Sequence, residues 1–291
     1  MPEWPPQSSD APGGSGPRRV IGIDAGGTKM LGGVVDRDLV VHHRVHRLWR
    51  GADRSEVLDI MVEEVDEARA AAPDAEAVGF GLPSLMDSEH GTSVSSVHLP
   101  LDDVPFRDLM SERLGMPVFV DNDANAAGLA EQRAGAARGA LDVVLLTLGT
   151  GIGGALILGG KVYRGSAGFA GELGHMTVDL DGDEHPGECE NHGCLEALVS
   201  GQAMARAGEE AARSEPSSGL GRALAQSREI TGALVTELAH DGDEVARGVV
   251  QLLGRRLGAG LVSVVNVFNP EVIVIGGGAA SSGELLLGPA R

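Results

Sequence analysis

The sequence has few cysteines, few basic residues for its acidic content, and no long uninterrupted hydrophobic run. Its 291 residues include 2 cysteines, Cys189 and Cys194, which are too few for a disulfide framework, so a cytoplasmic, reducing location is expected. The 23 Lys and Arg residues against 42 Asp and Glu residues give a formal net charge of −19. This charge argues against nucleic acid or an anionic membrane as the main partner, because both prefer a basic surface.

Targeting segments are also lacking. Residues 1–18 are rich in Pro, Gly and Ser without an apolar core of signal-peptide length, so they are predicted to form a disordered tail. The most apolar later stretch, residues 260–280, is interrupted by Asn269, Pro270 and Glu271, which predicts a helix, a turn and a strand instead of a membrane span. The 44 glycines have no fixed period, which excludes a collagen-like chain.

Hydrophobic patterning predicts an α/β protein with two similar halves. Each half begins with an apolar strand, a glycine-rich turn and two further strands. Asp53 and Glu56 predict a capping box at the start of the first helix. We expect an N-terminal lobe at residues 19–121, a C-terminal lobe at residues 122–291, and a cleft between them. The predicted strands cover residues 20–24, 31–36, 40–46, 77–82, 117–120, 143–148, 155–158, 162–163 and 272–275, and later helices cover 124–137, 195–213 and 244–268.

Three glycine-rich turns each follow an apolar strand. Ligands bind at the carboxyl ends of strands in open α/β sheets, and glycine lets phosphate oxygens approach backbone N–H groups closely. Neither a Walker A loop nor a Rossmann fingerprint is present. One such turn alone is also explained as a tight hairpin, but three at corresponding places predict a nucleotide site. Its residues would be Gly26, Gly27, Thr28, Lys29, Thr150, Gly151, Gly153, Gly277 and Gly278.

A polar run, Asp121-Asn122-Asp123-Ala124-Asn125, joins a predicted strand to an Ala-rich helix. Helix capping explains one of its four polar residues, because Asn and Asp accept hydrogen bonds from first-turn N–H groups. A carboxylate in this position is suited to orient and deprotonate a substrate hydroxyl. Phosphoryl transfer to an alcohol needs such a group.

A histidine and two cysteines predict a metal site. His175, Cys189 and Cys194 lie within 20 residues of one another, and zinc prefers such ligands. A lone histidine beside an apolar segment is more often structural, but the nearby cysteines favour a metal. A four-ligand site still lacks one member, for which His185, His192 or water remain candidates.

These motifs resemble those of the ROK family of repressors, open-reading-frame proteins and sugar kinases, which includes bacterial glucokinases. The family signature fits at every position from Leu148 to His175, and the resemblance extends from about residue 20 to the end of the chain. The matching motifs are DAGGTK at residues 24–29, DNDANAA at 121–127, GELGH at 171–175, GCLE at 193–196 and IGGG at 275–278.

The resemblance implies a duplicated ribonuclease-H-like fold of the actin and hexokinase type. It places Asp24 near magnesium, the first two glycine turns on the phosphates of ATP, and Gly277 with Gly278 at the adenosine. It makes Asp123 the base that takes the proton from the sugar 6-hydroxyl, and it assigns a structural zinc to His175, Cys189 and Cys194. Sugar hydroxyls would be held by Asn122, Asp123, Glu172, His175 and Glu196.

The sequence departs from the family pattern in three places. The family knuckle, Cys-x-Cys-Gly-x-x-Gly-Cys, has Gly187 here at its first cysteine and Glu190 at its first glycine. His98 replaces an asparagine that is common near the sugar, so it is counted as a substrate-binding residue expected to alter sugar choice or weaken binding. Family members usually continue past the position of Arg291 into another helix, which predicts a shortened C-terminus.

The favoured hypothesis is a glucokinase that phosphorylates glucose at the 6-hydroxyl with ATP and Mg²⁺. The alternatives are a kinase for another hexose or an N-acetylhexosamine, and a sugar-binding ROK protein without turnover. A sugar-responsive transcription factor would need a helix-turn-helix domain before the first glycine turn, where only about 20 residues precede it. We expect a cytoplasmic homodimer whose ligands are a hexose and ATP, with no nucleic-acid or membrane partner.

Overall fold

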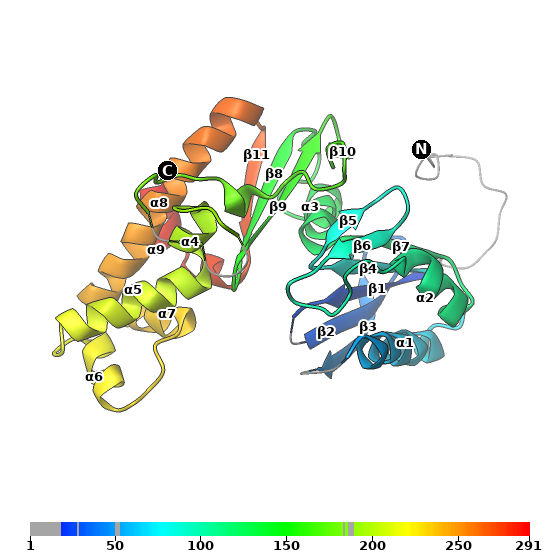
Figure 1. The fold of residues 1–291 in the computed structure, drawn as a ribbon, viewed down its shortest axis with the longest axis horizontal. Coiled ribbons are helices and arrows are strands. Elements are labelled where there is room, and N and C mark those ends of the chain that lie inside the picture. Colours follow the sequence, from blue (N-terminus) through cyan, green and yellow to red (C-terminus); the bar gives the residue numbers. More distant parts are fainter. Residues whose placement is uncertain (1–18, 28, 50–52, 183, 186–188) are drawn as a thin grey trace. The chain divides into compact units, whose positions relative to one another are not determined.

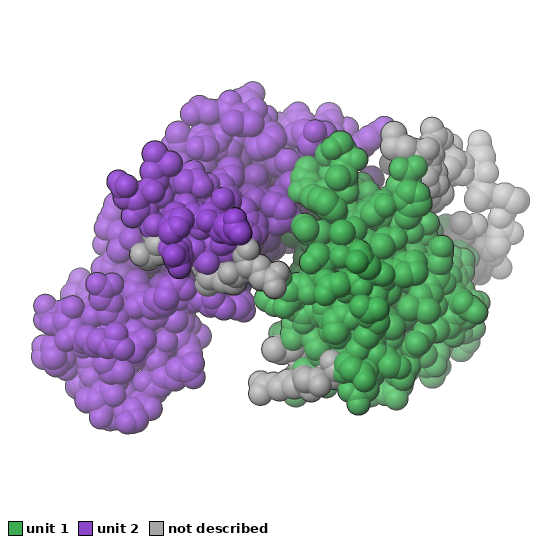
Figure 2. Space-filling view, viewed as in Figure 1, with its two compact units in different colours: residues 1–126, 164–170 green, residues 127–163, 171–291 purple. Residues whose placement is uncertain are grey.

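The computed structural model describes residues 19–27, 29–49, 53–182, 184–185 and 189–291. The chain divides into two compact units (Figure 2). Unit 1 contains the described residues up to Ala126 together with Arg164–Ala170, and unit 2 contains Ala127–Tyr163 and Gly171–Arg291. The predicted boundary lay after residue 121. The observed division instead falls within a helix, after Ala126, and assigns the later segment Arg164–Ala170 to unit 1. The predicted N-terminal tail lies outside the described residues.

Unit 1 is built on a five-stranded sheet with the order β3-β2-β1-β4-β7 (Figure 1). The central strand β1 pairs antiparallel with β2 and parallel with β4, and β4 pairs parallel with β7. A short hairpin of β5 and β6 follows β4. The elements are β1 (Arg19–Ala25), β2 (Lys29–Val35), β3 (Val41–Leu48), α1 (Arg54–Ala71), β4 (Ala75–Leu82), β5 (Leu85–Asp87), β6 (Thr92–Ser95), α2 (Phe106–Leu114) and β7 (Val118–Asn122).

The first helix of unit 1 follows the predicted pattern. The Asp53 side chain accepts a hydrogen bond from the Glu56 backbone N–H, and the Glu56 side chain accepts one from the Asp53 N–H, each at 3.0 Å, so the predicted capping box is confirmed. Val57 and Val65 are fully buried on one face of α1 and belong to the core of this unit. Pro73 follows the last turn, which is where a proline stops a helix.

Unit 2 repeats the same strand plan. Its sheet has the order β10-β9-β8-β11, in which β8 pairs antiparallel with β9 and parallel with β11, as β1 does with β2 and β4. The predicted duplication is therefore present in the strand pairing. The elements are α3 (Asp123–Ala134), which crosses the division between the units, β8 (Val143–Leu148), β9 (Ile152–Leu158), β10 (Lys161–Val162), η1 (Leu173–His175), α4 (Leu195–Val199), α5 (Gly201–Ser214), α6 (Gly219–Ala225), α7 (Gly232–His240), α8 (Glu244–Phe268), β11 (Val272–Gly276), η2 (Gly278–Ser282) and α9 (Glu284–Ala290).

The long helix α8 lies in the core of unit 2. Asp243 caps its start by accepting from the Ala246 N–H at 2.8 Å, and Asn269 ends it in the left-handed conformation. Within the described part of the chain, α8 alone has the length and apolar composition to cross a membrane. Leu253 and Leu257 on this helix are fully buried among the core side chains of the unit, as in a core helix of a globular protein. The predicted sequence of helix, turn and strand at residues 260–280 is confirmed.

One predicted helix is wrong in its continuity. Residues 195–213 form two helices, α4 and α5, which meet at Ser200. Ser200 has an extended backbone, and its hydroxyl oxygen accepts a hydrogen bond from the Ala203 N–H at 3.2 Å. A serine in this position starts a new helix, because its side chain competes with the helical hydrogen-bond pattern.

Candidate functional site

The first glycine turn and the candidate base lie at one edge of the unit 1 sheet. Strands β1, β4 and β7 are parallel, so their carboxyl ends meet at that edge. Asp24 is near the end of β1, and Asp123 begins α3 directly after β7. A Cβ atom added to Gly81, in β4, would lie 3.4 Å from the Asp123 Cα, which shows how closely the strand approaches this residue.

The carboxyl group of Asp24 acts on that of Asp123. Burial raises the pKa of Asp123, a hydrogen bond from the Ala124 N–H at 2.8 Å opposes the shift, and the neighbouring Asp24 charge adds to it. The pKa of Asp24 is also raised, because the surrounding protein partly desolvates it, while Lys29 acts in the opposite direction. The structure thus brings Asp24 and Asp123 together, and a pair of carboxylates of this kind suits a divalent cation.

His98 lies at the same place in unit 1. A Cβ atom added to Gly27 would lie 3.2 Å from the His98 Cβ, so the histidine packs against the first glycine turn. His98 also lowers the pKa of Asp123, opposite to the effect of burial. The residue predicted near the sugar is therefore beside both the phosphate turn and the candidate base. Thr28, predicted to bind phosphate, lies outside the described residues.

The remaining residues of the polar run after β7 have structural partners. The Asn122 side-chain oxygen accepts from the Asn125 N–H at 3.1 Å and caps α3. Asp121 forms an ion pair with Arg164, whose Nε donates to Oδ2 at 3.1 Å. Capping and ion pairing therefore explain more of this run than the sequence suggested. Asn122, predicted to bind sugar, also donates from Nδ2 to the Ser84 carbonyl oxygen at 3.4 Å.

The second and third glycine turns are neighbours in unit 2. The second turn joins β8 to β9, and the Gly201 N–H at the start of α5 donates to the Gly149 carbonyl oxygen at 2.8 Å. Strand β11 runs parallel to β8, so Gly277 follows it at the same edge. Gly277 has a φ of 83°, and a Cβ atom there would lie 2.5 Å from the Leu148 carbonyl oxygen. Thr150 and Gly151 lie in the second turn, Gly278 follows Gly277, and Gly153 belongs to strand β9.

Glu196 connects the second turn to the Gly-Glu-Leu-Gly-His element. Its Oε2 atom accepts a hydrogen bond from the Ile152 N–H at 2.5 Å. Cβ atoms added to Gly151 and Gly174 would lie 2.5 and 3.4 Å from the same oxygen. Glu172 is exposed and directly precedes η1, which ends at His175. The element that carries the predicted sugar residues of unit 2 is therefore close to the second glycine turn.

A His/Cys cluster lies beside Glu196. The ligand atoms of His175, His185 and Cys189 all lie within 4.8 Å of one another, and His175 Nδ1 is 3.3 Å from Cys189 Sγ. Cys194 Sγ is fully buried and lies 3.5 Å from the His175 carbonyl oxygen. Burial, together with Cys189, raises the pKa of the Cys194 thiol to about 11. The predicted ligands are thus neighbours, and the structure adds His185. Gly187, at the departure from the family knuckle, lies outside the described residues.

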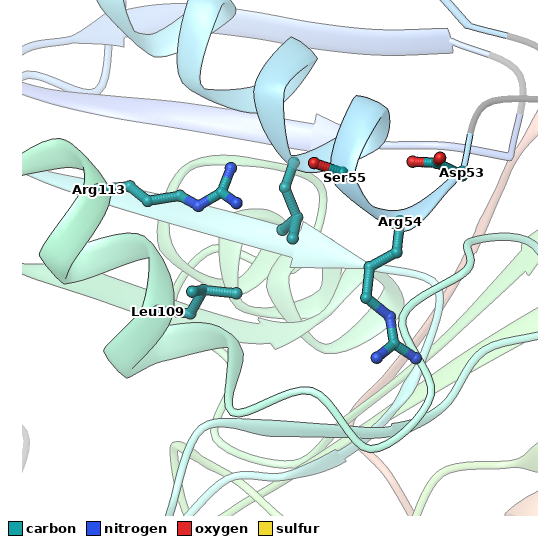
Figure 3. Close-up of a pocket in the computed structure, with 6 residues that line it drawn as sticks. Asp53, Arg54, Ser55, Leu109 and Arg113 are labelled. Atoms are coloured by element: carbon teal, nitrogen blue, oxygen red, sulfur yellow. The ribbon is translucent and has the colours of Figure 1, made fainter.

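A surface hollow of about 580 Å³ on unit 1 contains none of the predicted site residues (Figure 3). Its two arginines are already engaged. Arg54 donates to the carbonyl oxygens of Pro100 and Asp102, and Arg113 pairs with Asp59 at 2.7 Å. The hollow is therefore not a second candidate for the reactive site.

The sequence profile of the ROK family matches residues 20–290. The chain belongs to the ROK family. It is 33% identical to a glucokinase of Streptomyces coelicolor over 276 residues, covering 93% of this chain and 85% of that protein. It is 31% identical to a xylose repressor of Caldicellulosiruptor bescii over 243 residues, covering 81% of this chain and 60% of that protein.

A solved ROK family glucokinase has the same fold. The structure from Streptomyces griseus, in complex with glucose and AMPPNP, matches with a TM-score of 0.83 and 36% identity, covering 94% of this chain and 87% of that chain. The predicted two-lobe α/β fold of the actin and hexokinase type is confirmed for this ROK chain. The ROK family includes both kinases and repressors. The residues of the site therefore bear on which of the two activities this chain has.

Proposed function

We propose that this ROK protein is a glucokinase that transfers the γ-phosphoryl group of ATP to the 6-hydroxyl of glucose. The observation that carries the proposal is the position of Asp123, at the carboxyl edge of the unit 1 sheet beside Asp24 and the first glycine turn. The similarity to glucokinases over nearly the whole chain supports the same activity. ATP, a divalent cation and a hexose are the ligands that this activity requires.

Asp123 is proposed to accept the proton of the attacking hydroxyl. Burial raises its pKa, which makes the carboxylate a stronger base than an exposed aspartate. Backbone N–H groups of the glycine turns would hold the phosphates, with Lys29 as a countercharge. Asp24 is suited to the magnesium of the nucleotide because its carboxylate is a hard oxygen ligand. Magnesium bound with ATP would neutralise charge that develops on the phosphate oxygens.

A structural zinc is proposed beside the sugar residues. His175, Cys189 and Cys194 supply one imidazole and two thiols, which is the donor chemistry of structural zinc sites. The arrangement fits, because His175 Nδ1 already lies 3.3 Å from Cys189 Sγ, close to the ~3.5 Å expected between nitrogen and sulfur ligands of one tetrahedral zinc. Zinc here would position the start of α4, which carries Glu196 directly after Cys194 and Leu195.

A cytoplasmic homodimer is proposed as the working state. The end of α8 exposes three valines, Val262, Val265 and Val267, with 61%, 45% and 71% of their surface accessible. Neighbouring apolar side chains on one exposed helix end suit contact with a second copy of the chain. The low cysteine content and the similarity to glucokinases support the cytoplasmic part of this proposal.

The test is Asp123→Asn, with Asp66→Asn on the exposed side of α1 as the matched control. We expect Asp123→Asn to lower kcat by about 10²–10⁴-fold, because general-base catalysis contributes that much, while calorimetry still detects glucose binding. Asp66→Asn should keep the wild-type rate. ADP release would be measured with glucose, mannose, fructose, allose, N-acetylglucosamine and N-acetylmannosamine.

Two results would contradict the proposal. Near wild-type turnover by Asp123→Asn would show that Asp123 is not the catalytic base. Sugar binding by the wild-type protein without ADP release for any of these sugars would favour the alternative, a sugar-binding ROK protein without turnover. Release of ADP with a sugar other than glucose would keep the kinase and change its substrate.

A further inference from the structure

His185 is a buried histidine whose ring nitrogens make no hydrogen bond within the described part of the chain. Its side chain is 5% exposed, and neither Nδ1 nor Nε2 makes a hydrogen bond to any described residue. Nε2 lies 3.0 Å from Glu196 Oε1, but not in hydrogen-bond geometry. A buried polar group without a hydrogen bond is costly, so the position of this imidazole needs an explanation.

The surroundings of His185 explain it as a ligand. Its ring lies beside that of His175, with 4.7 Å between the ring centroids, and a ligand atom of His185 is within 4.8 Å of those of His175 and Cys189. Cys194 lies beside this group of three: its residue is fully buried, its thiol interacts with Cys189, and Sγ lies 3.5 Å from the His175 carbonyl oxygen. Two imidazoles and one thiol therefore face one small volume, with a second thiol next to them.

The local backbone selects His185 over His192. The His185 N–H donates to the Asn191 carbonyl oxygen at 3.0 Å, and Glu184 pairs with His192 as an antiparallel bridge. This contact folds the loop back on itself, which leaves His192 exposed while His185 is buried. Of the two histidines in the loop, only His185 is placed to reach the other donors.

We infer that His185 is the fourth zinc ligand, so that the site is His175, His185, Cys189 and Cys194. The inference rests on the zinc site proposed above and adds a ligand that this chain supplies itself. Because Nε2 faces Glu196, Nδ1 is the nitrogen that we assign to the metal. Nε2 lies 3.0 Å from a carboxylate oxygen, and a hydrogen bond formed there when metal binds would orient the imidazole and raise its basicity.

The experiment compares the full-length wild-type protein with His185→Ala, His185→Cys and the control His192→Ala, all kept reduced. Zinc content is measured by elemental analysis, and Co²⁺ is titrated into metal-free protein while its visible and near-ultraviolet absorption is recorded. We expect one tetrahedral Co²⁺ per chain in the wild type and in His192→Ala. His185→Ala should bind at least ~100-fold more weakly, since loss of even an outer-shell partner weakens metal binding ~10–100-fold.

His185→Cys keeps the test decisive if the alanine variant does not fold. It should still bind Co²⁺, and the thiolate-to-cobalt absorption should rise about 1.5-fold, from two thiolates to three. An unchanged thiolate band in His185→Cys, wild-type affinity in His185→Ala, or no metal in the wild type would each overturn the inference. Kinase activity is measured separately. Protein that binds no metal but releases ADP would refute only the assignment of His185 as a zinc ligand. Protein that binds metal but releases no ADP would refute only the proposed kinase activity.

Discussion

Glu64 is expected to make unit 1 less stable as the pH rises. It lies on the core face of α1 with none of its surface exposed, and neither carboxyl oxygen has a hydrogen-bond partner among the described residues. A Cβ atom added to Gly32 in β2 would lie 3.0 Å from Glu64 Oε1, so the carboxyl group packs against the sheet. Burial raises the pKa of Glu64 to about 7, opposed by Arg47 and assisted by Glu67.

The sign and size of the effect follow from this pKa. Below pH 4.5, the ordinary pKa of the group, it is protonated in both the folded and unfolded chain. Between pH 4.5 and 7 the unfolded chain loses its proton first, so the free energy of unfolding falls by about 1.4 kcal/mol per pH unit. Above pH 7 the loss levels off at roughly 3 kcal/mol, a large share of the about 5–15 kcal/mol that stabilises a typical protein.

The perturbation is Glu64→Gln, which keeps the shape and removes the ionisation. We expect its free energy of unfolding to be close to that of the wild type at pH 5 and up to about 3 kcal/mol higher at pH 8. Urea unfolding would be followed by the fluorescence of Trp49, which is buried in unit 1 and donates from Nε1 to the Gly26 carbonyl oxygen at 3.0 Å. Trp4 is replaced by phenylalanine throughout, so that only unit 1 is observed.

Asp66→Asn is the matched control, because Asp66 is an exposed acid on the same helix. It should leave the pH dependence as it is in the wild type. If the difference between Glu64→Gln and the wild type is the same at pH 5 and pH 8, Glu64 does not titrate in this range and the argument from burial fails.

Two further predictions concern the site. Because the pKa of Asp123 is raised, kcat/KM for glucose should fall as the pH is lowered, with a midpoint above the pKa of an ordinary aspartate. A midpoint of the acid limb near 3.8 in the pH–rate profile would contradict the buried environment of Asp123. Gly277→Ala should raise KM for ATP by at least about tenfold, since the new methyl group would meet the Leu148 carbonyl oxygen at a φ of 83°. The control is Gly248→Ala in α8, where an added Cβ atom meets nothing within 4 Å, and it should change KM little. Equal KM values for the two variants would show that the third turn does not contact nucleotide.

Local signals explain what the sequence predicted well. Strand β8 and helix α8 have the predicted limits, because an apolar run bounded by turn residues and a helix with an aspartate cap are both marked by neighbouring residues. The short hairpin of β5 and β6 and the helices α6 and α7 were not predicted. Strands of three and four residues have too few positions to show an alternating pattern, so their pairing depends on the rest of unit 1.

The site was predictable where one segment carries it and less so where segments meet. The glycine turns are visible because each follows its own strand, but the contact between Gly277 and Leu148 depends on parallel pairing of β11 with β8 across the whole of unit 2. Likewise, the spacing of His185 and His192 gives no reason to prefer one as a metal ligand. The preference comes from a loop that buries one ring and exposes the other.

Glu196 connects the proposed zinc site to the second glycine turn. One of its oxygens accepts from the Ile152 N–H beside the second glycine turn, and the other lies 3.0 Å from His185 Nε2. Rotation of this carboxylate would break its hydrogen bond to the Ile152 N–H and move the other oxygen away from the histidine. Zinc on His185 would therefore hold Glu196 in one orientation, and through Ile152 it would fix the second glycine turn as well. Zinc loss should then weaken nucleotide and sugar binding together, which calorimetry on metal-free and zinc-loaded protein would measure.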